Sequence, residues 1–416
     1  MALKKKPTTG MKDILPKEME IRDYVISQIK ETYKTFGFQS IETPCVEHIE
    51  NLNSKQGGEN EKLIFKIMKR GQKLNLETAE TEADLVDSGL RYDLTVPLSR
   101  YYSNNANDLP APFKALQMGN VWRADRPQRG RFRQFMQCDI DILGEPTYLA
   151  EIELILATTT LLGKLDFKNF TIRINNRKML KGMAKYCGFP EESYDDVFII
   201  LDKMDKIEMA GVESELLEAG YAAESVAKCK ELFETVTNDL DGVKYMKETL
   251  GDCLEDGVAE DLDMIISTVE SVKTADFKIA FDPTLVRGMS YYTGPIFEIA
   301  MDEFGGSVGG GGRYDEMIGK FTGNNTPACG FSIGFERIVM LLLERDYQVP
   351  GGGKKKAYLI DKKASKEKMK EVIELAKKER EQGIQVNINI MKKNKKFQKE
   401  QLAEDGYTDI VEFFAD

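Results

Sequence analysis

The 416-residue sequence predicts an α+β protein of several domains: a main body built on an antiparallel hairpin, a helical insertion, and a small C-terminal α/β domain. Three observations support this fold class. The chain is longer than one ordinary domain. Acid-rich helical segments replace strands between residues 185 and 273. After a Pro-Gly-Gly-Gly-Lys-Lys-Lys linker at residues 350–356, short strands and helices alternate.

The N-terminal part begins with an amphipathic helix. Ile21, Val25, Ile29 and Tyr33 recur every four residues within the predicted helix at residues 17–37. The elements expected next are an extended stretch at 38–49, a polar hairpin with mobile loops at 53–88, strands at 113–122 and 132–143, and a buried helix at 148–162.

The elements after the insertion are expected in two groups. The first group contains strands at 278–281, 296–301 and 329–333 and an apolar helix at 336–344. The second group is strand 357–360, helix 365–382, strand 384–390, helix 397–405 and strand 409–414, an alternation that predicts parallel strands. The predicted domains are therefore 1–184 and 274–349 for the main body, 185–273 for the insertion, 350–356 for the linker and 357–416 for the last domain.

Composition excludes several classes of protein. The sequence has no run of 18 apolar residues, so no membrane-spanning helix is expected. The basic N-terminus lacks the apolar stretch of a secretory signal. The six cysteines form no CxxC pair, so structural zinc is not expected, and reduced thiols are typical of a cytoplasmic protein.

The chain has a single histidine, His48, and it is predicted to be a structural or surface residue. A histidine-based nucleophilic site or a multi-histidine metal site therefore has almost no residues from which to form. Any chemistry must use arginine, carboxylate, amide and backbone groups, which suit the stabilisation of charged phosphates.

The charge is uneven along the chain. The net charge is −11, but residues 351–416 hold 16 Lys/Arg against 12 Asp/Glu, which leaves −15 on residues 1–350. A basic terminal domain on an acidic body is typical of a protein that binds one polyanion in one place, although a solvated lysine-rich surface gives the same pattern.

The densest group of basic residues lies between the two strands expected at 113–122 and 132–143, from Arg123 to Gln137. In an antiparallel hairpin, alternate residues share a face, so Arg131, Arg133, Phe135 and Gln137 could line one surface. Guanidinium groups bind phosphate and a phenyl ring can stack on a base. The alternative is a charged hairpin tip without a ligand.

Two further segments are candidates for a pocket. The run Gly-Gly-Ser-Val-Gly-Gly-Gly-Gly-Arg-Tyr-Asp at residues 305–315 is either a flexible loop or a close approach of backbone to a small ligand. It matches neither a Walker loop nor a dinucleotide fingerprint. The run Leu-Val-Arg-Gly-Met-Ser-Tyr-Tyr-Thr-Gly at 285–294 suggests a pocket wall or a buried tyrosine pair of the core.

Together these motifs resemble those of the class II aminoacyl-tRNA synthetases, and specifically of the histidyl-tRNA synthetase family, from Gly10 to the end of the chain. FGFQSIETP resembles class II motif 1, VWRADRPQRGRFRQF motif 2 and GFSIGFERI motif 3. LVRGMSYYTG and GGRYD resemble the two histidine-specific motifs, and LRYDLTVPLSRY is similar to another substrate-binding stretch. The resemblance implies a catalytic core built on an antiparallel sheet.

The resemblance also implies roles at ATP. Arg123 would contact the α-phosphate, Asp125 the adenine edge, and Phe135 would stack on the adenine. Arg131 and Arg337 would hold the outer phosphates, and Arg337 would also sandwich the base. Arg123, Arg287 and Arg337 are the catalytic candidates, with Arg287 stabilising charge at the α-phosphate. The implied cosubstrate is ATP with Mg2+, and no protein ligand of the metal is identified.

For histidine, the resemblance implies a set of seven residues. Asp93 and Thr95 would bind the α-amino group, Asp141 and Tyr292 the imidazole, and Gln137 the carboxylate side, with Arg287 and Tyr291 completing the set. Gln128 and Arg129 would approach the acceptor end of tRNA(His). The domain at 357–416 resembles an anticodon-binding domain, apparently a short one, and motif 1 implies a homodimer.

The function implied is ATP-dependent activation of histidine and its transfer to tRNA(His). The alternative is a non-catalytic relative that binds histidine as the regulatory subunit of ATP phosphoribosyltransferase. Retention of Arg123, Arg131, Arg287 and Arg337 favours the enzyme, and it also disfavours an RNA-binding or sensory protein on the same scaffold.

Overall fold

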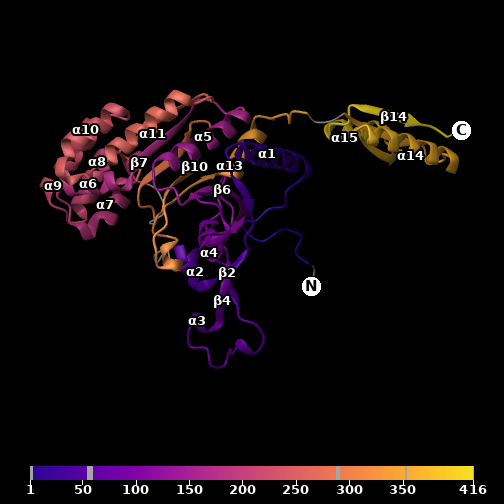
Figure 1. Ribbon diagram of the computed structural model, residues 1–416. Helices are drawn as coiled ribbons and strands as arrows, with labels where there is room; N and C mark the ends of the chain where they lie inside the picture. Colours follow the sequence, from indigo (N-terminus) through magenta and orange to yellow (C-terminus); the bar gives the residue numbers. More distant parts are fainter. Residues whose placement is uncertain (1–2, 54–59, 287–290, 352–353, 416) are drawn as a thin grey trace. The chain divides into compact units, whose positions relative to one another are not determined.

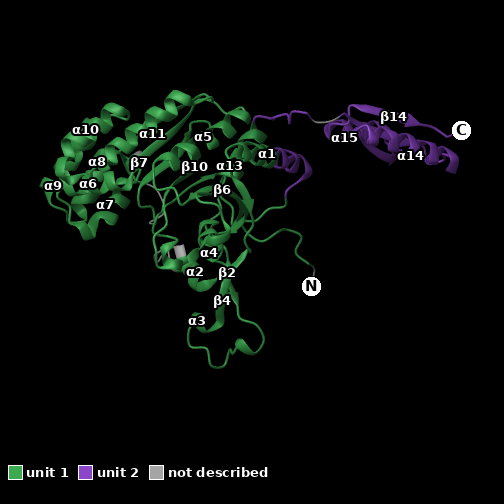
Figure 2. Ribbon diagram, in the orientation of Figure 1, with its two compact units in different colours: residues 1–13, 25–344 green, residues 14–24, 345–416 purple. Residues whose placement is uncertain are grey.

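The computed structural model describes residues 3–53, 60–286, 291–351 and 354–415. The chain divides into two compact units, which Figure 2 distinguishes by colour. The larger unit consists of Met1–Asp13 and Val25–Glu344, and the smaller of Ile14–Tyr24 and Arg345–Asp416. Arg287, which the motif comparison makes a catalytic candidate, lies outside the described residues.

The larger unit is built around an eight-stranded, mostly antiparallel sheet (Figure 1), which confirms the fold class expected for the main body. The strand order is β1-β5-β6-β11-β10-β9-β7-β8, and the outer pairs β1–β5 and β7–β8 are parallel. The strands are β1 (Gln39–Ile41), β5 (Phe113–Trp122), β6 (Gln134–Leu143), β7 (Phe170–Asn176), β8 (Phe277–Phe281), β9 (Pro295–Met301), β10 (Gly306–Arg313) and β11 (Ala328–Ile333).

The central hairpin of β5 and β6 agrees with the sequence prediction. Its ten paired positions run from Phe113 opposite Leu143 to Trp122 opposite Gln134. Helix α5 (Leu149–Lys164) contacts β6 and β11 and is mostly buried, as its apolar composition predicts, and α13 (Phe335–Glu344) contacts β6. Helix α1 (Pro16–Thr35) keeps the predicted four-residue apolar spacing, because Val25, Ile29 and Tyr33 are fully buried.

The glycine run corrects one interpretation of the sequence. Residues 306–313 do not form a flexible loop but strand β10, between β9 and β11 in the middle of the sheet. Glycine is required there by contact between strands: a Cβ on Gly311 would lie 2.0 Å from the carbonyl oxygen of Gly330 and 2.7 Å from the ring of Phe297. The glycines therefore leave room above the sheet that side chains would fill.

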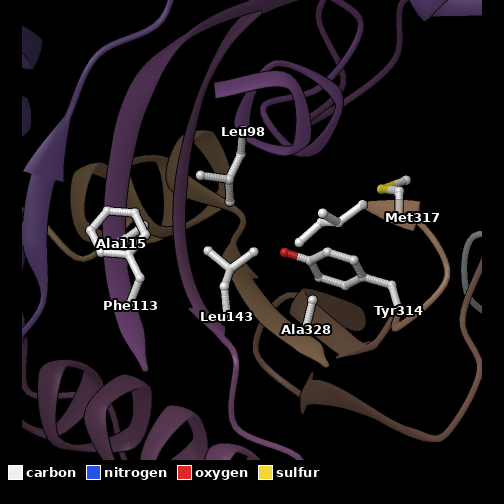
Figure 3. Close-up of a cluster of buried hydrophobic side chains, with 8 residues drawn as sticks. Leu98, Phe113, Ala115, Leu143, Tyr314, Met317 and Ala328 are labelled. Atoms are coloured by element: carbon white, nitrogen blue, oxygen red, sulfur yellow. The ribbon is translucent and has the colours of Figure 1, made fainter. Parts of the chain in front are cut away.

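A cluster of buried hydrophobic side chains packs beside strands β5, β6 and β11 (Figure 3). It contains Leu98 from helix α4 (Thr95–Asn105), together with Phe113, Leu143 and Ala328. Tyr314 lies among these apolar side chains, 2% exposed, at the end of β10. This packing holds the tyrosine ring in place and leaves its hydroxyl as the polar group that needs a partner.

Two smaller regions complete the unit. A three-stranded antiparallel sheet has the order β2-β4-β3, with β2 (Val46–His48), β3 (Lys66–Met68) and β4 (Val86–Leu90), and it lies near helices α2 (Ile49–Asn53) and α3 (Glu82–Leu85). His48 is exposed on β2, as expected of a surface residue. Helix α12 (Gly319–Thr322) contacts α4.

Helices gather at the end of the sheet formed by β7 and β8 (Figure 1). The predicted helical character of residues 185–273 is confirmed, although α6 begins before residue 185, so the proposed domain boundaries stay predictions. The helices are α6 (Arg177–Cys187), α7 (Tyr194–Leu201), α8 (Met204–Glu218), α9 (Ala223–Thr235), α10 (Leu240–Leu250) and α11 (Val258–Val272).

The smaller unit contains the predicted parallel α/β domain. Its sheet has the order β13-β12-β14 with both pairs parallel, and Tyr358, Val372 and Val386 belong to its core. The elements are β12 (Lys355–Ile360), α14 (Lys366–Glu381), β13 (Gln385–Ile390), α15 (Lys395–Glu404) and β14 (Asp409–Phe413). Among the described helices of the whole chain, none is long and apolar enough to cross a membrane.

Candidate active site on the antiparallel sheet

One pocket lies on the central strands of the large sheet and encloses about 110 Å³. Its floor is the glycine backbone of β10 and β11, where the absence of side chains opens the space. Its walls come from β6, from the start of α4 and from the tyrosine pair before β9. The residues that line it are Asp93, Thr95, Arg123, Gln137, Asp139, Asp141, Tyr291, Tyr292, Gly310, Gly311, Tyr314, Gly330, Phe331 and Ser332.

Three buried carboxylates give this pocket an acidic side: Asp93, Asp139 and Asp141, which are 3%, 5% and 4% exposed. Asp139 and Asp141 point to one face because alternate residues of a strand share a face. Asp93 accepts a hydrogen bond of 3.0 Å from the backbone N–H of Val96, in the first turn of α4. An empty pocket with three such groups favours a ligand that carries positive charge or several N–H donors.

Asp141 is oriented by Tyr314. The tyrosine hydroxyl donates to Asp141 Oδ1 over 2.5 Å. Burial raises the pKa of Asp141 to about 7, although the Tyr314 hydrogen bond acts in the opposite direction. Asp141 can therefore change its ionisation near neutral pH, and its second oxygen is available to a donor in the pocket.

The tyrosine pair forms the opposite wall. Tyr291 and Tyr292 pack edge to face with ring centroids 5.0 Å apart, and Tyr291 packs in the same way on Tyr314 at 6.0 Å. Burial raises the pKa values of all three phenols, so their hydroxyls stay protonated and serve as neutral hydrogen-bond groups. The sequence interpretations of a pocket wall and of a packed tyrosine pair are both correct for these residues.

The basic side of the pocket begins with Arg123, which follows β5. Its guanidinium carbon lies 4.3 Å from the ring centroid of Tyr92 and 5.2 Å from that of Phe135. Its Nε donates to the carbonyl of Tyr92 over 3.1 Å. Two rings and one carbonyl hold this arginine in place, with the rest of its donors available to an anion.

The loop between β5 and β6 ends in a tight turn, Gln128 to Arg131, which we call the arginine turn. The backbone N–H of Gln128 donates to the carbonyl of Arg131 over 3.2 Å, and the reverse bond is 2.9 Å. Gly130 occupies the turn with φ 68°, a conformation that favours glycine. Arg129 donates to both oxygens of Glu344, at 2.8 and 2.9 Å.

Arg337 of α13 lies beside this turn. It donates to the carbonyl of Ser307 and lies 5.0 Å from the ring centroid of Phe304. Burial lowers its pKa, and repulsion from Arg131 acts in the same direction. Two guanidinium groups that repel each other suit a phosphate ligand, although the carboxylate of Glu298 partly offsets the charge of Arg337.

The structure therefore separates the predicted residues into groups. Of the seven predicted histidine ligands, all but Arg287 line the one pocket: Asp93, Thr95, Gln137, Asp141, Tyr291 and Tyr292. Of the predicted ATP ligands, Arg123 lines the pocket and Phe135 packs against it, whereas Arg131 and Arg337 lie together at the arginine turn. The carbonyl of Asp125 accepts from Arg133 Nε over 3.0 Å, so Arg133 braces the loop.

Several pocket residues are not among the sequence candidates: Asp139, Tyr314, Ser332, Phe331 and the floor glycines Gly310, Gly311 and Gly330. The alternation Gln137, Asp139, Asp141 carries a signal for the first of these, because one face of a strand repeats every second residue. Among the described residues, no group of three or more His, Cys, Asp or Glu side chains could hold a metal ion.

Comparisons with known proteins agree with this geometry. The family model described as histidyl-tRNA synthetase matches residues 10–338. A histidine–tRNA ligase of Leifsonia xyli subsp. xyli is 45% identical over 346 residues, covering 81% of this chain and 80% of that protein. One of Christiangramia forsetii is 38% identical over 357 residues, covering 83% and 78%.

Solved structures show the same fold. The crystal structure of histidyl-tRNA synthetase from Nostoc sp. PCC 7120 matches with TM-score 0.79 and 28% identity, over 100% of this chain and 93% of that one. An ATP phosphoribosyltransferase regulatory subunit/histidyl-tRNA synthetase from Bacillus halodurans also matches with TM-score 0.79, but at 20% identity it shows the fold alone.

The antiparallel sheet, with a basic and an acidic side to one pocket, is that of a class II aminoacyl-tRNA synthetase. Within that class, the chain belongs to the histidyl-tRNA synthetase family.

Proposed function

We propose that the chain is a histidine–tRNA ligase that forms histidyl-adenylate and pyrophosphate from histidine and ATP, and then transfers histidine to tRNA(His). The observation that carries this proposal is the pocket, in which seven residues chosen from sequence motifs, the six histidine candidates and Arg123, line one space on the sheet. The curated relatives at 38% and 45% identity bear the same activity in their names.

In the first step, a carboxylate oxygen of histidine attacks the α-phosphorus of ATP, and pyrophosphate leaves. Arg123 would stabilise the added negative charge, since its rings and carbonyl hold it before the substrate arrives. Arg287 would act on the same phosphate. Phe135 would stack on the adenine, Asp125 would meet its edge, and Arg131 with Arg337 would bind the outer phosphates.

The acidic side would select the amino acid. Asp141 would accept a hydrogen bond from the imidazole while Tyr292 contacts the ring, and Asp93 and Thr95 would bind the α-ammonium group. Gln137 would orient the carboxylate towards Arg123, and Tyr291 would pack beside the ring. Neutral phenols and buried acids favour a side chain with ring N–H groups over an apolar one of similar size.

In the second step, a ribose hydroxyl at the acceptor end of tRNA(His) attacks the activated carbonyl, and AMP leaves. Gln128 and Arg129 would guide that end, and the basic domain at 357–416 would bind the anticodon. Because the described residues form no metal-binding cluster, Mg2+ would be held mainly by ATP phosphates and water. We also propose a homodimer, on the resemblance of motif 1 alone.

The competing function is the histidine-binding regulatory subunit of ATP phosphoribosyltransferase. That protein has no need of an ATP-activating arginine set, whereas this chain keeps Arg123 at the pocket and Arg131 with Arg337 at the arginine turn.

The deciding experiment is histidine-dependent ATP–pyrophosphate exchange, followed by charging of a tRNA pool with labelled histidine. Exchange with charging is the expected result. Exchange without charging would contradict the tRNA step alone, and histidine binding without exchange would favour the regulatory subunit.

A further inference from the structure

Asp139 is a carboxylate of the pocket that neither the sequence motifs nor the proposed roles use. It is 5% exposed and lines the pocket, yet its Oδ1 atom has no hydrogen-bond partner. Its other oxygen, Oδ2, lies 3.4 Å from the amide nitrogen of Gln137, a long contact. A buried carboxylate oxygen without a donor is unfavourable unless a ligand supplies one or the group is protonated.

The charges around Asp139 do not neutralise it. Burial raises the pKa of Asp139 most, and the carboxylates of Asp141 and Asp93 raise it further. A hydrogen bond from Ser332 and the guanidinium of Arg123 act in the opposite direction, but the pKa stays well above its ordinary value. Arg91, which also interacts with it, is engaged with the carbonyls of Thr43 and Asn120.

The phenols nearby cannot serve as counter-ions. The tyrosines that interact electrostatically with Asp139 are Tyr33, Tyr291 and Tyr292, and burial raises the pKa of each. They are neutral at physiological pH and carry no positive charge to offset the carboxylate. Burial and the neighbouring carboxylates therefore favour the protonated form of Asp139 in the pocket without ligand.

The position of Asp139 along β6 indicates which part of the substrate it meets. Gln137, Asp139 and Asp141 lie on one face of the strand, at a spacing of about 6.8 Å for every second residue. If Gln137 lies at the substrate carboxylate and Asp141 at the imidazole, the residue between them faces the carbon that bears the ammonium group. Ser332, directly opposite Asp139 on β11, borders the same place.

We propose that Asp139 is a specificity residue that binds the α-ammonium group of histidine together with Asp93, and that it releases a proton to solvent when histidine binds. This rests on the proposed function, since it assumes histidine in the pocket. The ammonium N–H groups supply the donor that Oδ1 lacks. The cation also replaces the proton as the partner of the buried charge, so that the pocket admits amino acids and discriminates against acids that lack the amino group.

The test is calorimetric binding to the full-length protein at pH 7, in two buffers of different ionisation enthalpy, so that protons released can be counted. The ligands are L-histidine and 3-(imidazol-4-yl)propanoate, which lacks only the amino group. Asp139→Asn, which keeps the shape of the side chain, is compared with the wild type. Asp141→Asn serves as the matched variant on the same strand face.

For histidine, Asp139→Asn should raise Kd roughly tenfold to hundredfold, the range of a charge-assisted hydrogen bond, and should release fewer protons than the wild type. For the propanoate, both proteins should bind with similar Kd. Asp141→Asn should weaken both ligands, because its partner is the imidazole that both contain.

Equal weakening of the two ligands by Asp139→Asn, or unchanged proton release with histidine, would overturn the assignment. Failure of the wild type to bind histidine would instead overturn the proposed function. A thermal unfolding curve of Asp139→Asn without ligand provides the folding control: replacing an unpartnered buried acid by a neutral amide should not lower Tm, whereas a purely structural role would lower it.

Discussion

The acidic and basic sides of the proposed active site differ in burial and in how their charges are held. On the acidic side, Asp139 and Asp141 are at most 5% exposed, and burial raises the pKa of both. On the basic side, Arg123 and Arg337 are held by aromatic rings and backbone carbonyls rather than by carboxylates.

This difference follows from what each side is proposed to bind. An arginine remains charged in almost any environment, so the protein can place it at a half-buried site and leave its donors open to phosphate. A buried carboxylate can instead be neutralised by a proton until a cation arrives. Amino acid selection should therefore depend on pH near neutrality, whereas ATP binding should depend on geometry.

The largest expected effect is on the basic side. Arg123→Ala removes the donor proposed for the α-phosphate, and the rate of pyrophosphate exchange should fall about 10²–10³-fold. Arg126→Ala, an exposed arginine of the same loop, is the matched control and should stay near the wild-type rate. Similar losses in both variants would mean that the loop contributes only general positive charge.

The next effect is on the acidic side. Asp141→Asn removes the acceptor proposed for the imidazole and should raise KM for histidine roughly tenfold to hundredfold, as expected for a hydrogen bond to a charged group. KM for ATP should change much less. Steady-state exchange kinetics with each substrate varied in turn measure both constants, and equal increases would contradict the separation of the two sides.

A smaller effect should appear in the pH profile. The pKa of Asp141 is about 7 and the Tyr314 hydrogen bond holds it down, so Tyr314→Phe should raise that pKa. If ionised Asp141 binds histidine better than the protonated form, the pH at which histidine affinity rises should be higher in Tyr314→Phe than in the wild type. At pH 7, KM should rise up to about tenfold for one pKa unit.

Tyr358→Phe is the control for this prediction, since Tyr358 donates to Glu379 over 2.6 Å in the other unit. It should leave the pH profile of histidine KM unchanged. An unchanged profile in Tyr314→Phe would show that Asp141 does not govern the pH dependence.

The raised pKa of Asp141 also predicts how the stability of the protein depends on pH. Asp141 has a folded-state pKa above its ordinary value of 3.8, so its contribution to stability is present at low pH and is lost as pH rises through about 7. The Asp141→Asn variant has no carboxyl group at this position and so does not lose stability in this way. The free energy of unfolding of the variant, relative to that of the wild type, should therefore increase between pH 4 and pH 8. Denaturant titrations at several pH values measure this difference.

The smallest effect concerns the arginine turn. The Arg129–Glu344 ion pair is half-exposed, with side chains 59% and 46% exposed, so Glu344→Gln should change stability by less than about 1 kcal/mol. Because Arg129 is then free to meet the acceptor end, KM for tRNA should change while pyrophosphate exchange does not. A change in exchange alone would place Arg129 at ATP instead.

The sequence by itself determined much of this protein. Periodicity placed α1, α5 and the β5–β6 hairpin within a few residues, because burial on one side of a helix or strand imposes a regular pattern on side chains. The motifs also identified the family and seven of the residues that line the pocket, since arginine, carboxylate and tyrosine side chains at those positions carry chemistry that few other patterns share.

Only the tertiary structure decided the rest. The glycine run is ambiguous in sequence, because glycine is favoured both in loops and where backbones pack closely, and only the neighbours Phe297 and Gly330 show that β10 needs it. For Asp139, the sequence shows only that it shares a strand face with Gln137 and Asp141, and not that its carboxylate is buried. Whether a carboxylate is solvated or buried beside two others depends on which strands and helices meet around it, and that is set by long-range packing rather than by local pattern.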